Sequence, residues 1–128
     1  MRGQAKADQL KRRTKALALR AISLCRSLPF NIEGRTFASQ LLRSATSVGA
    51  NYRAVCRARS RKEFVAKLGV VIEECDETLF WLELLAEAGV GPAEEISSLH
   101  REAEELLSIF VVSRATARRG LPRQKAIP

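Results

Sequence analysis

The feature that most constrains this chain is a repeated spacing of apolar residues, which recur at alternating steps of three and four positions in four separate stretches. That spacing places apolar side chains along one face of an α-helix, whereas a half-buried strand requires strict alternation, which no stretch shows. The four stripes consist of Leu10, Thr14, Leu17, Ala21, Leu24 and Leu28; Phe37, Leu41, Ser44, Val48, Tyr52 and Val55; Phe64, Leu68, Val71, Cys75, Leu79, Leu82 and Ala86; and Ile96, Leu99, Ala103, Leu106, Phe110, Ser113 and Ala117. The sequence therefore predicts an all-α protein with four amphipathic helices.

Residues that stop or cap helices separate the first three stripes. Pro29 ends the first helix, and the second is expected from near Thr36 to near Arg59. Ser60, with Glu63 three residues later, forms the capping-box pattern that opens a third helix.

A glycine- and proline-containing segment, residues 89–92, ends the third helix and starts the fourth. The chain of 128 residues is long enough for one ordinary domain and too short for two. We expect residues 1–117 to form that domain, and residues 118–128 to form a flexible basic tail that includes Gly120 and Pro122.

The connections between the expected helices are short, which makes successive helices antiparallel neighbours in an up-and-down four-helix bundle. This topology brings one end of each helix together, and those four ends are rich in lysine and arginine. The residues expected to form a nucleic-acid-binding surface there are Arg12, Arg13, Arg53, Arg57, Arg59, Arg61, Lys62, Arg118 and Arg119. The acidic residues of the third and fourth helices gather toward the opposite end.

The charge of the chain is strongly basic and unevenly distributed. The formal net charge is +8 and the isoelectric point is about 10.1, yet Arg101 is the only basic residue within 68–107. A basic surface of this kind favours a polyanionic partner such as RNA or DNA. An equally weighted interpretation is that the cations form solvated helix faces, offset helix dipoles, or meet acidic faces of another subunit.

No constellation of catalytic or metal-binding residues is present. The single histidine, His100, follows Ser97 at the spacing where a di-iron bundle needs glutamate, so that metal site cannot be assembled. Cys25, Cys56 and Cys75 are odd in number and lack metal-ligand spacing. We therefore predict no catalytic residues, no metal, no cofactor and no enzyme activity.

The chain contains no apolar run of the length that spans a bilayer, and its basic start leads into a charged periodic pattern. These features predict a cytoplasmic protein without a membrane partner.

The third and fourth helices carry more apolar residues than one stripe needs. Phe80, Trp81 and Leu84 widen the apolar surface of the third helix, and Val111 and Val112 widen that of the fourth. Because no helix of a four-helix bundle is central, such surface is expected to be covered by another copy of the chain. The sequence predicts a homo-oligomer with these five residues at its interface.

Three ordered blocks, residues 44–53, 57–64 and 74–85, resemble a family of bacterial four-helix-bundle proteins encoded in intervening sequences of large-subunit ribosomal RNA. The resemblance implies an antiparallel bundle that assembles as a ring-like homopentamer, has a basic surface suspected of binding nucleic acid, and lacks enzyme activity. A related branch is similar in fold and comprises the accessory variability determinants of diversity-generating retroelements. Two hypotheses stay open: an oligomeric RNA- or DNA-binding protein, and an oligomeric scaffold for a protein partner.

Overall fold

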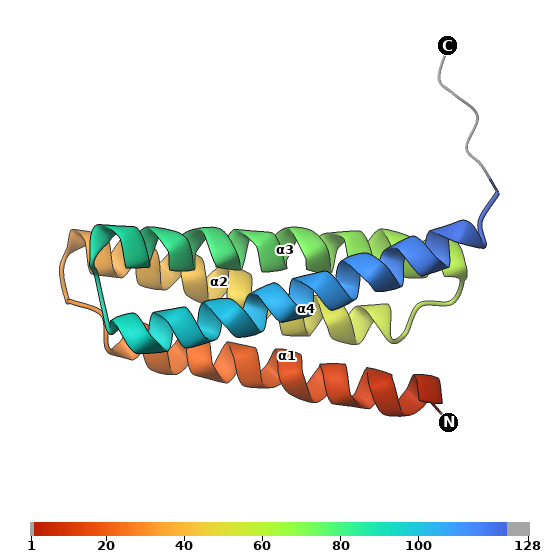
Figure 1. The fold of residues 1–128 in the computed structure, drawn as a ribbon, viewed down its shortest axis with the longest axis horizontal. Helices are drawn as coiled ribbons and strands as arrows, with labels where there is room; N and C mark the ends of the chain where they lie inside the picture. Colours follow the sequence, from red (N-terminus) through yellow and green to blue (C-terminus); the bar gives the residue numbers. More distant parts are fainter. Residues whose placement is uncertain (1, 123–128) are drawn as a thin grey trace, which may run out of the picture.

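The computed structural model describes residues 2–122, and all regular structure within that range is helical. The helices are α1 (Arg2–Arg26), α2 (Ile32–Val55), α3 (Arg61–Ala88) and α4 (Ala93–Arg119) (Figure 1). The prediction of an all-α protein with four helices is confirmed. Within residues 2–122, none of the helices combines the length and the apolarity that crossing a membrane requires.

The helix α2 begins four residues earlier and ends four residues earlier than the sequence pattern predicts. Its N-cap is Asn31, whose side chain accepts a hydrogen bond from the backbone N–H of Gly34 at 2.8 Å. Gly34 is required because a Cβ at this position would collide with the carbonyl of Pro29. The apolar stripe begins only at Phe37, and Ile32 in the first turn is exposed, so the stripe gives no indication of the first turn of α2.

The helix α3 begins as predicted, because the Ser60 hydroxyl accepts a hydrogen bond from the N–H of Glu63 at 3.0 Å. It ends at Gly89, which adopts a left-handed conformation with φ of 68°. The last helix, α4, extends to Arg119, so the first two residues of the predicted flexible tail, Arg118 and Arg119, are helical. Residues 123–128 of that tail lie outside the described residues.

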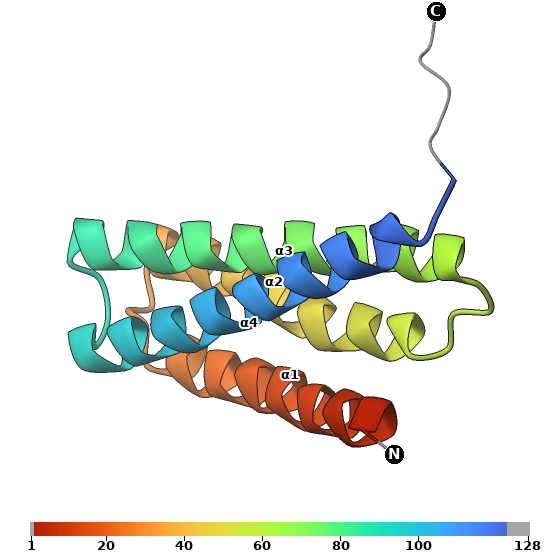
Figure 2. The same cartoon turned by 45° about the vertical axis from the view of Figure 1, so that its right-hand side comes forward.

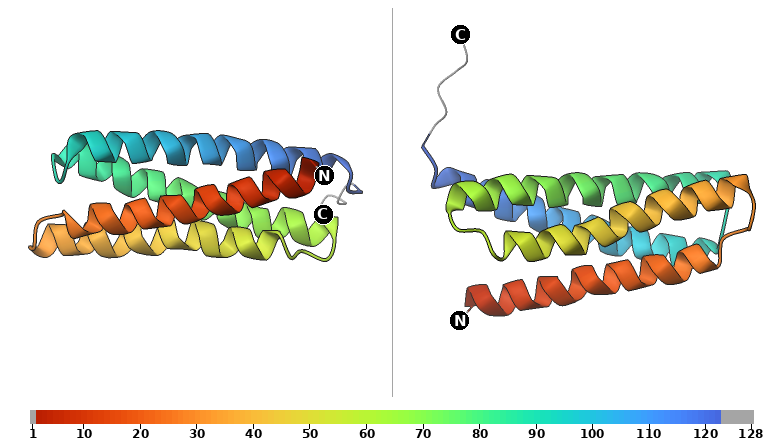
Figure 3. Two further views of the ribbon diagram at one scale, coloured as in Figure 1. Left: turned by 90° about the horizontal axis from the view of Figure 1, so that it is seen from below. Right: turned by 180° about the vertical axis from the view of Figure 1, so that it is seen from behind.

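The helices run in alternating directions along a common axis, as the views in Figures 1 and 2 show. Each helix contacts its neighbours in the chain, α1 also contacts α4, and the α1–α4 contact is the smallest. The start of α1, the end of α2, the start of α3 and the end of α4 therefore lie at one end of the molecule (Figure 3). This arrangement places the basic helix ends close together.

The core lies between all four helices and consists mainly of leucine. Leu17, Leu41, Leu82, Leu99 and Phe110 are each completely buried, one or two from every helix. Burial of each large apolar side chain contributes about 1.5–3 kcal/mol. Twenty hydrophobic residues within the described range are buried and form one cluster, so a single core holds the helix ends in place.

One hydrogen-bonded pair of hydroxyls is enclosed in this core. Thr78 of α3 donates a hydrogen bond to the Ser44 hydroxyl of α2 at 3.1 Å. The Ser44 hydroxyl in turn donates to the carbonyl of Leu41 at 3.2 Å, so both buried hydroxyls are satisfied.

Candidate nucleic-acid interface

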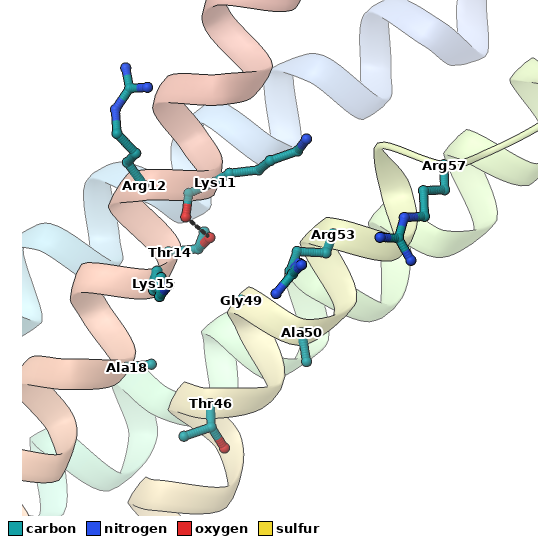
Figure 4. Close-up of a pocket in the computed structure, with 10 residues that line it drawn as sticks. All are labelled: Lys11, Arg12, Thr14, Lys15, Ala18, Thr46, Gly49, Ala50, Arg53 and Arg57. Atoms are coloured by element: carbon teal, nitrogen blue, oxygen red, sulfur yellow. Dashed lines mark hydrogen bonds between the residues drawn. The ribbon is translucent and has the colours of Figure 1, made fainter.

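A groove between α1 and α2 is strongly cationic. Its walls carry five basic side chains: Lys11, Arg12 and Lys15 from α1, and Arg53 and Arg57 from the end of α2 and the turn that follows it. Figure 4 shows Lys11, Arg53 and Arg57 extending into the space between the two helices, whereas Arg12 extends from α1 away from α2. No carboxylate lines the groove.

The floor of the groove consists of small residues, which allow α1 and α2 to approach closely. Ala18, Gly49 and Ala50 lie there, and a Cβ at Gly49 would stand 3.4 Å from the carbonyl oxygen of Thr14. Side chains this small leave the long basic residues to form the walls. The result is a shallow apolar floor between two cationic rims.

The spacing of the cations on α1 follows from helix geometry. Lys11 and Lys15 are four residues apart on α1, so the pair lies on one face with a rise of about 6 Å. On the other wall, Arg53 belongs to α2 and Arg57 to the turn that follows it. Within residues 2–122, the ion pair that involves any of these four is that of Lys11 with Asp8, at 3.9 Å between partly exposed groups. An exposed pair at this distance contributes little, so the groove keeps its positive charge.

A second hollow continues the cationic surface around the turn between α2 and α3. It shares Arg53 and Arg57 with the groove and adds Arg59 and Lys67. Its one acid is Glu63, which approaches Lys67 at 3.8 Å and accepts a hydrogen bond from the backbone N–H of Arg59 at 3.4 Å. With four cations and one acid, this hollow also carries an excess of positive charge.

The remaining predicted residues lie at the same end of the molecule but not in the groove. Arg61 lines a separate hollow between the start of α3 and the end of α4, and its guanidinium packs against Gly120. Lys62, Arg118 and Arg119 are exposed on the ends of α3 and α4. They extend the basic end without contributing to the groove.

Arg13 lies on the opposite face of α1 from the groove. Its guanidinium contacts Glu102 at 2.5 Å and Glu105 at 3.1 Å, and both carboxylates belong to α4. The hydrogen bond to Glu102 raises the pKa of Arg13 above its ordinary value, with the charge of Glu102 and Glu105 acting in the same direction. Arg13 is thus an α1–α4 bridge, and its positive charge is already neutralised.

Two further arginines bridge helices on the acidic side of the molecule. Arg20 of α1 pairs with Glu95 of α4 at 3.3 Å, and Arg43 of α2 pairs with Glu74 of α3 at 3.4 Å and with Glu77. These cations balance the acidic α3–α4 hairpin within one protomer. Within residues 2–122, by contrast, none of the cations of the α1–α2 groove forms an ion pair with a carboxylate of another helix.

The apolar residues predicted at an oligomer interface differ in exposure. Phe80, Val111 and Val112 are exposed, at 51%, 43% and 64% of their full surface, whereas Trp81 and Leu84 are half-buried. Trp81 packs edge-on against Phe80 and against Phe37 of α2, with ring centroids 5.1 Å and 6.3 Å apart. Trp81 therefore belongs largely to the α2–α3 packing.

Cys25 and Cys75 are poorly placed to act as nucleophiles. Burial raises the pKa of the Cys75 thiol to about 12 and also raises the pKa of Cys25, so neither is a ready nucleophile. Tyr52 is buried against Phe110, with ring centroids 5.4 Å apart, and does not stand free to stack on a base. Residues 2–122 contain no cluster of histidine, cysteine or carboxylate side chains arranged to hold a metal.

Lys11 and Lys15 line the groove but are not among the binding residues predicted from the sequence. Their spacing of four residues is visible in the sequence and would have placed them on one helix face. The position of that face relative to α2 requires the structure.

The fold and the groove define a small four-helix protein with a cationic interhelical surface. The model of the 23S rRNA-intervening sequence protein family matches residues 7–111, and the chain belongs to that family. A solved structure similar to this chain is a protein with unknown function from the S23 ribosomal protein family of Bacteroides thetaiotaomicron, at 30% identity and a TM-score of 0.71. The similarity covers 81% of this chain and 96% of that one. Comparison with curated proteins gives no match.

Proposed function

We propose that this protein binds nucleic acid, RNA or DNA, through contacts to the phosphates and without catalysing a reaction. The observation that carries the proposal is the α1–α2 groove, in which five basic side chains face solvent with no carboxylate among them. A lysine or arginine placed beside a phosphate displaces condensed counterions, which gives affinity that depends steeply on salt and little on sequence. The name of the family refers to ribosomal RNA, which is consistent with such a partner.

The wider basic end supports the same role. Arg59, Arg61 and Lys62 at the α2–α3 connection, with Arg118 and Arg119 on α4, surround the groove with further positive charge. Their contribution is long-range attraction, because exposed charges still act over a Debye length of about 8 Å at physiological salt.

The working form in this proposal is a cytoplasmic homo-oligomer of antiparallel four-helix bundles, a homopentamer by family resemblance. Phe80 and Val111 support it, since both are large apolar side chains left in contact with solvent in one protomer. Sedimentation that shows a stable monomer at micromolar concentration would contradict this part of the proposal.

A second candidate is a scaffold whose ligand is another protein. Phe30 and Ile32 are exposed at 90% and 76% of their full surface. Phe30 belongs to the connection between α1 and α2 and Ile32 is the first residue of α2, at the opposite end of the molecule from the start of α1 (Figure 1). Exposed aromatic and aliphatic side chains of this kind commonly anchor protein interfaces. Such a scaffold would show no salt-sensitive affinity for nucleic acid.

The experiment that tests the proposal compares two double variants of equal charge. Arg53→Gln/Arg57→Gln removes two cations from the groove, and Arg26→Gln/Arg35→Gln removes two exposed cations from the far end. Filter binding to a structured RNA and a DNA duplex at about 50 mM salt should show an affinity loss on the order of tenfold or more for the groove variant.

The far-end variant is expected to bind almost as the parent protein does, because it has lost the same net charge but no groove cation. Equal losses in the two variants would show that only net charge matters, and the groove proposal would then be wrong. No binding by the parent protein at low salt would favour the scaffold.

A further inference from the structure

Base recognition by single-strand-binding proteins depends on exposed aromatic side chains, because each base stacks on a ring. The chain has five phenylalanines, one tyrosine and one tryptophan, all within the described residues, and none of them lines the α1–α2 groove. Tyr52, the aromatic residue nearest in sequence to Arg53, is buried in the core against Phe110. The groove therefore offers no stacking platform.

The other aromatic residues are committed elsewhere. Phe37, Phe80 and Trp81 form an edge-to-face cluster on α2 and α3. Phe30 lies beneath the guanidinium of Arg35, 5.4 Å from ring centre to Cζ, at the far end of the molecule. Phe64 is half-buried against the core and lines the separate hollow between α3 and α4.

The donor protons of the neutral hydroxyls in the groove are already used by the helix backbone. The Thr14 hydroxyl donates to the carbonyl of Lys11 at 3.1 Å, and the Thr46 hydroxyl donates to the carbonyl of Leu42 at 2.7 Å. These two threonines are the only uncharged polar side chains among the lining residues, where asparagine, glutamine and carboxylates are absent. Asparagine and glutamine are the side chains that read adenine, and acidic side chains read cytosine, so the groove lacks the partners for these two bases.

What remains in the groove is charge on two facing walls. Cations on α1 and cations at the end of α2 can reach phosphates from two sides, and their attraction rises with the density of phosphates presented to them. A duplex carries one charge per about 1.7 Å of axis, about twice the density of one strand.

From these observations we infer that the α1–α2 groove takes a double-stranded nucleic acid by its phosphate backbone and without preference for base sequence. The inference rests on the proposed function and narrows its ligand from nucleic acid in general to duplexes. If the four cations within the groove and Arg12 on its outer rim each contact one phosphate, affinity falls with salt with a logarithmic slope of about −4.5 for a duplex and about −3.5 for a single strand. That difference corresponds to about tenfold tighter duplex binding near 0.1 M salt.

The test uses fluorescence anisotropy with the parent protein and oligonucleotides of equal length: an RNA duplex, a DNA duplex, and each component strand designed to be unstructured. Two unrelated base sequences are used for every form. The inference predicts that both kinds of duplex bind about tenfold tighter than their strands near 0.1 M salt, and that the two sequences differ by less than about twofold. The groove variant Arg53→Gln/Arg57→Gln, with three of the five cations left, should prefer the duplex only about fourfold, whereas Arg26→Gln/Arg35→Gln should keep the full preference.

Single strands that bind as tightly as duplexes, or one base sequence that binds on the order of tenfold tighter than the other, would overturn the inference while leaving nucleic-acid binding in place. Absence of binding to every form would overturn the proposed function and the inference with it. Binding restricted to one kind of duplex would overturn the claim that phosphates alone are recognised.

Discussion

Arg13 and Lys15 lie two residues apart on α1 and carry the same charge. Substitution of Arg13 by glutamine is expected to reduce stability, whereas substitution of Lys15 by glutamine is expected to weaken nucleic-acid binding. Two residues correspond to about 200° of rotation around a helix, so the two side chains lie on opposite faces. Arg13 faces α4, where it pairs with Glu102 and Glu105, while Lys15 lines the groove against α2. The structure thus assigns stability to one cation and binding to the other.

The loss of stability expected for Arg13→Gln follows from the exposure of the Arg13–Glu102 ion pair. The Arg13 side chain is 23% exposed and that of Glu102 is 25% exposed, so the pair is neither buried nor freely solvated. Exposed pairs contribute about 0.2–1 kcal/mol, and this pair lies at the upper end of that range because it is mostly shielded from solvent, so the expected loss is about 1 kcal/mol. For a chain of 128 residues that loss lowers the melting temperature by about 4 °C.

The loss of duplex affinity expected for Lys15→Gln follows from counterion release. Loss of one phosphate contact should reduce the salt slope of duplex binding by about 0.9 and weaken affinity by about eightfold near 0.1 M salt. Stability should change by no more than about 0.5 kcal/mol, because Lys15 is exposed and unpaired within residues 2–122.

Both variants are measured by thermal unfolding and by duplex titration at several salt concentrations. A slope change in Arg13→Gln with no loss of stability, or a loss of stability in Lys15→Gln with an unchanged slope, would refute the assignment of the two faces of α1.

Three further predictions concern the fold. Phe110→Ala should reduce the free energy of unfolding by about 3–5 kcal/mol, because Phe110 is completely buried; a urea midpoint almost equal to the parent's would contradict this. Gly34→Ala should cost at least about 1–3 kcal/mol, since its Cβ meets the Pro29 carbonyl, whereas Gly3→Ala, with nothing within 4 Å, should not destabilise; equal melting temperatures for the two would be inconsistent with the turn. The free energy of unfolding should fall as pH rises above about 9, because burial raises the pKa of Cys75 from 9.0 to about 12 and the thiol of the unfolded chain loses its proton first. In urea unfolding at alkaline pH, Cys75→Ala should flatten this fall. An unchanged pH dependence would exclude the thiol as its source.

The four helices could be predicted because their buried residues follow one spacing almost without exception, from Leu17 in α1 to Phe110 in α4. The capping residues Ser60 and Gly89 fixed the two ends of α3 equally well. The start of α2 was missed because its first turn has no buried apolar side chain to continue the stripe. There the helix depends on the Asn31 cap and on the space beside Gly34.

The basic end could be predicted from topology, whereas the roles of single cations could not. Position along a helix determines which end a residue occupies, but contact with a neighbouring helix depends also on the rotation of both helices. Arg13 was grouped with the binding residues because its partners, Glu102 and Glu105, are about ninety positions away in sequence and nothing local reports their approach. Lys15 was omitted because nothing in the local sequence shows that its face of α1 lies beside α2.

The most direct test of the central claim is to locate bound nucleic acid on the protein surface. Cross-linking of a short duplex to the parent protein at low salt, followed by mass spectrometry, reports which residues lie within reach of the phosphates. The groove predicts cross-links to residues 11–18 of α1 and 46–57 of α2 and the adjoining turn. Cross-links confined to residues 26–35 or 94–101, at the far end of the molecule, would contradict it.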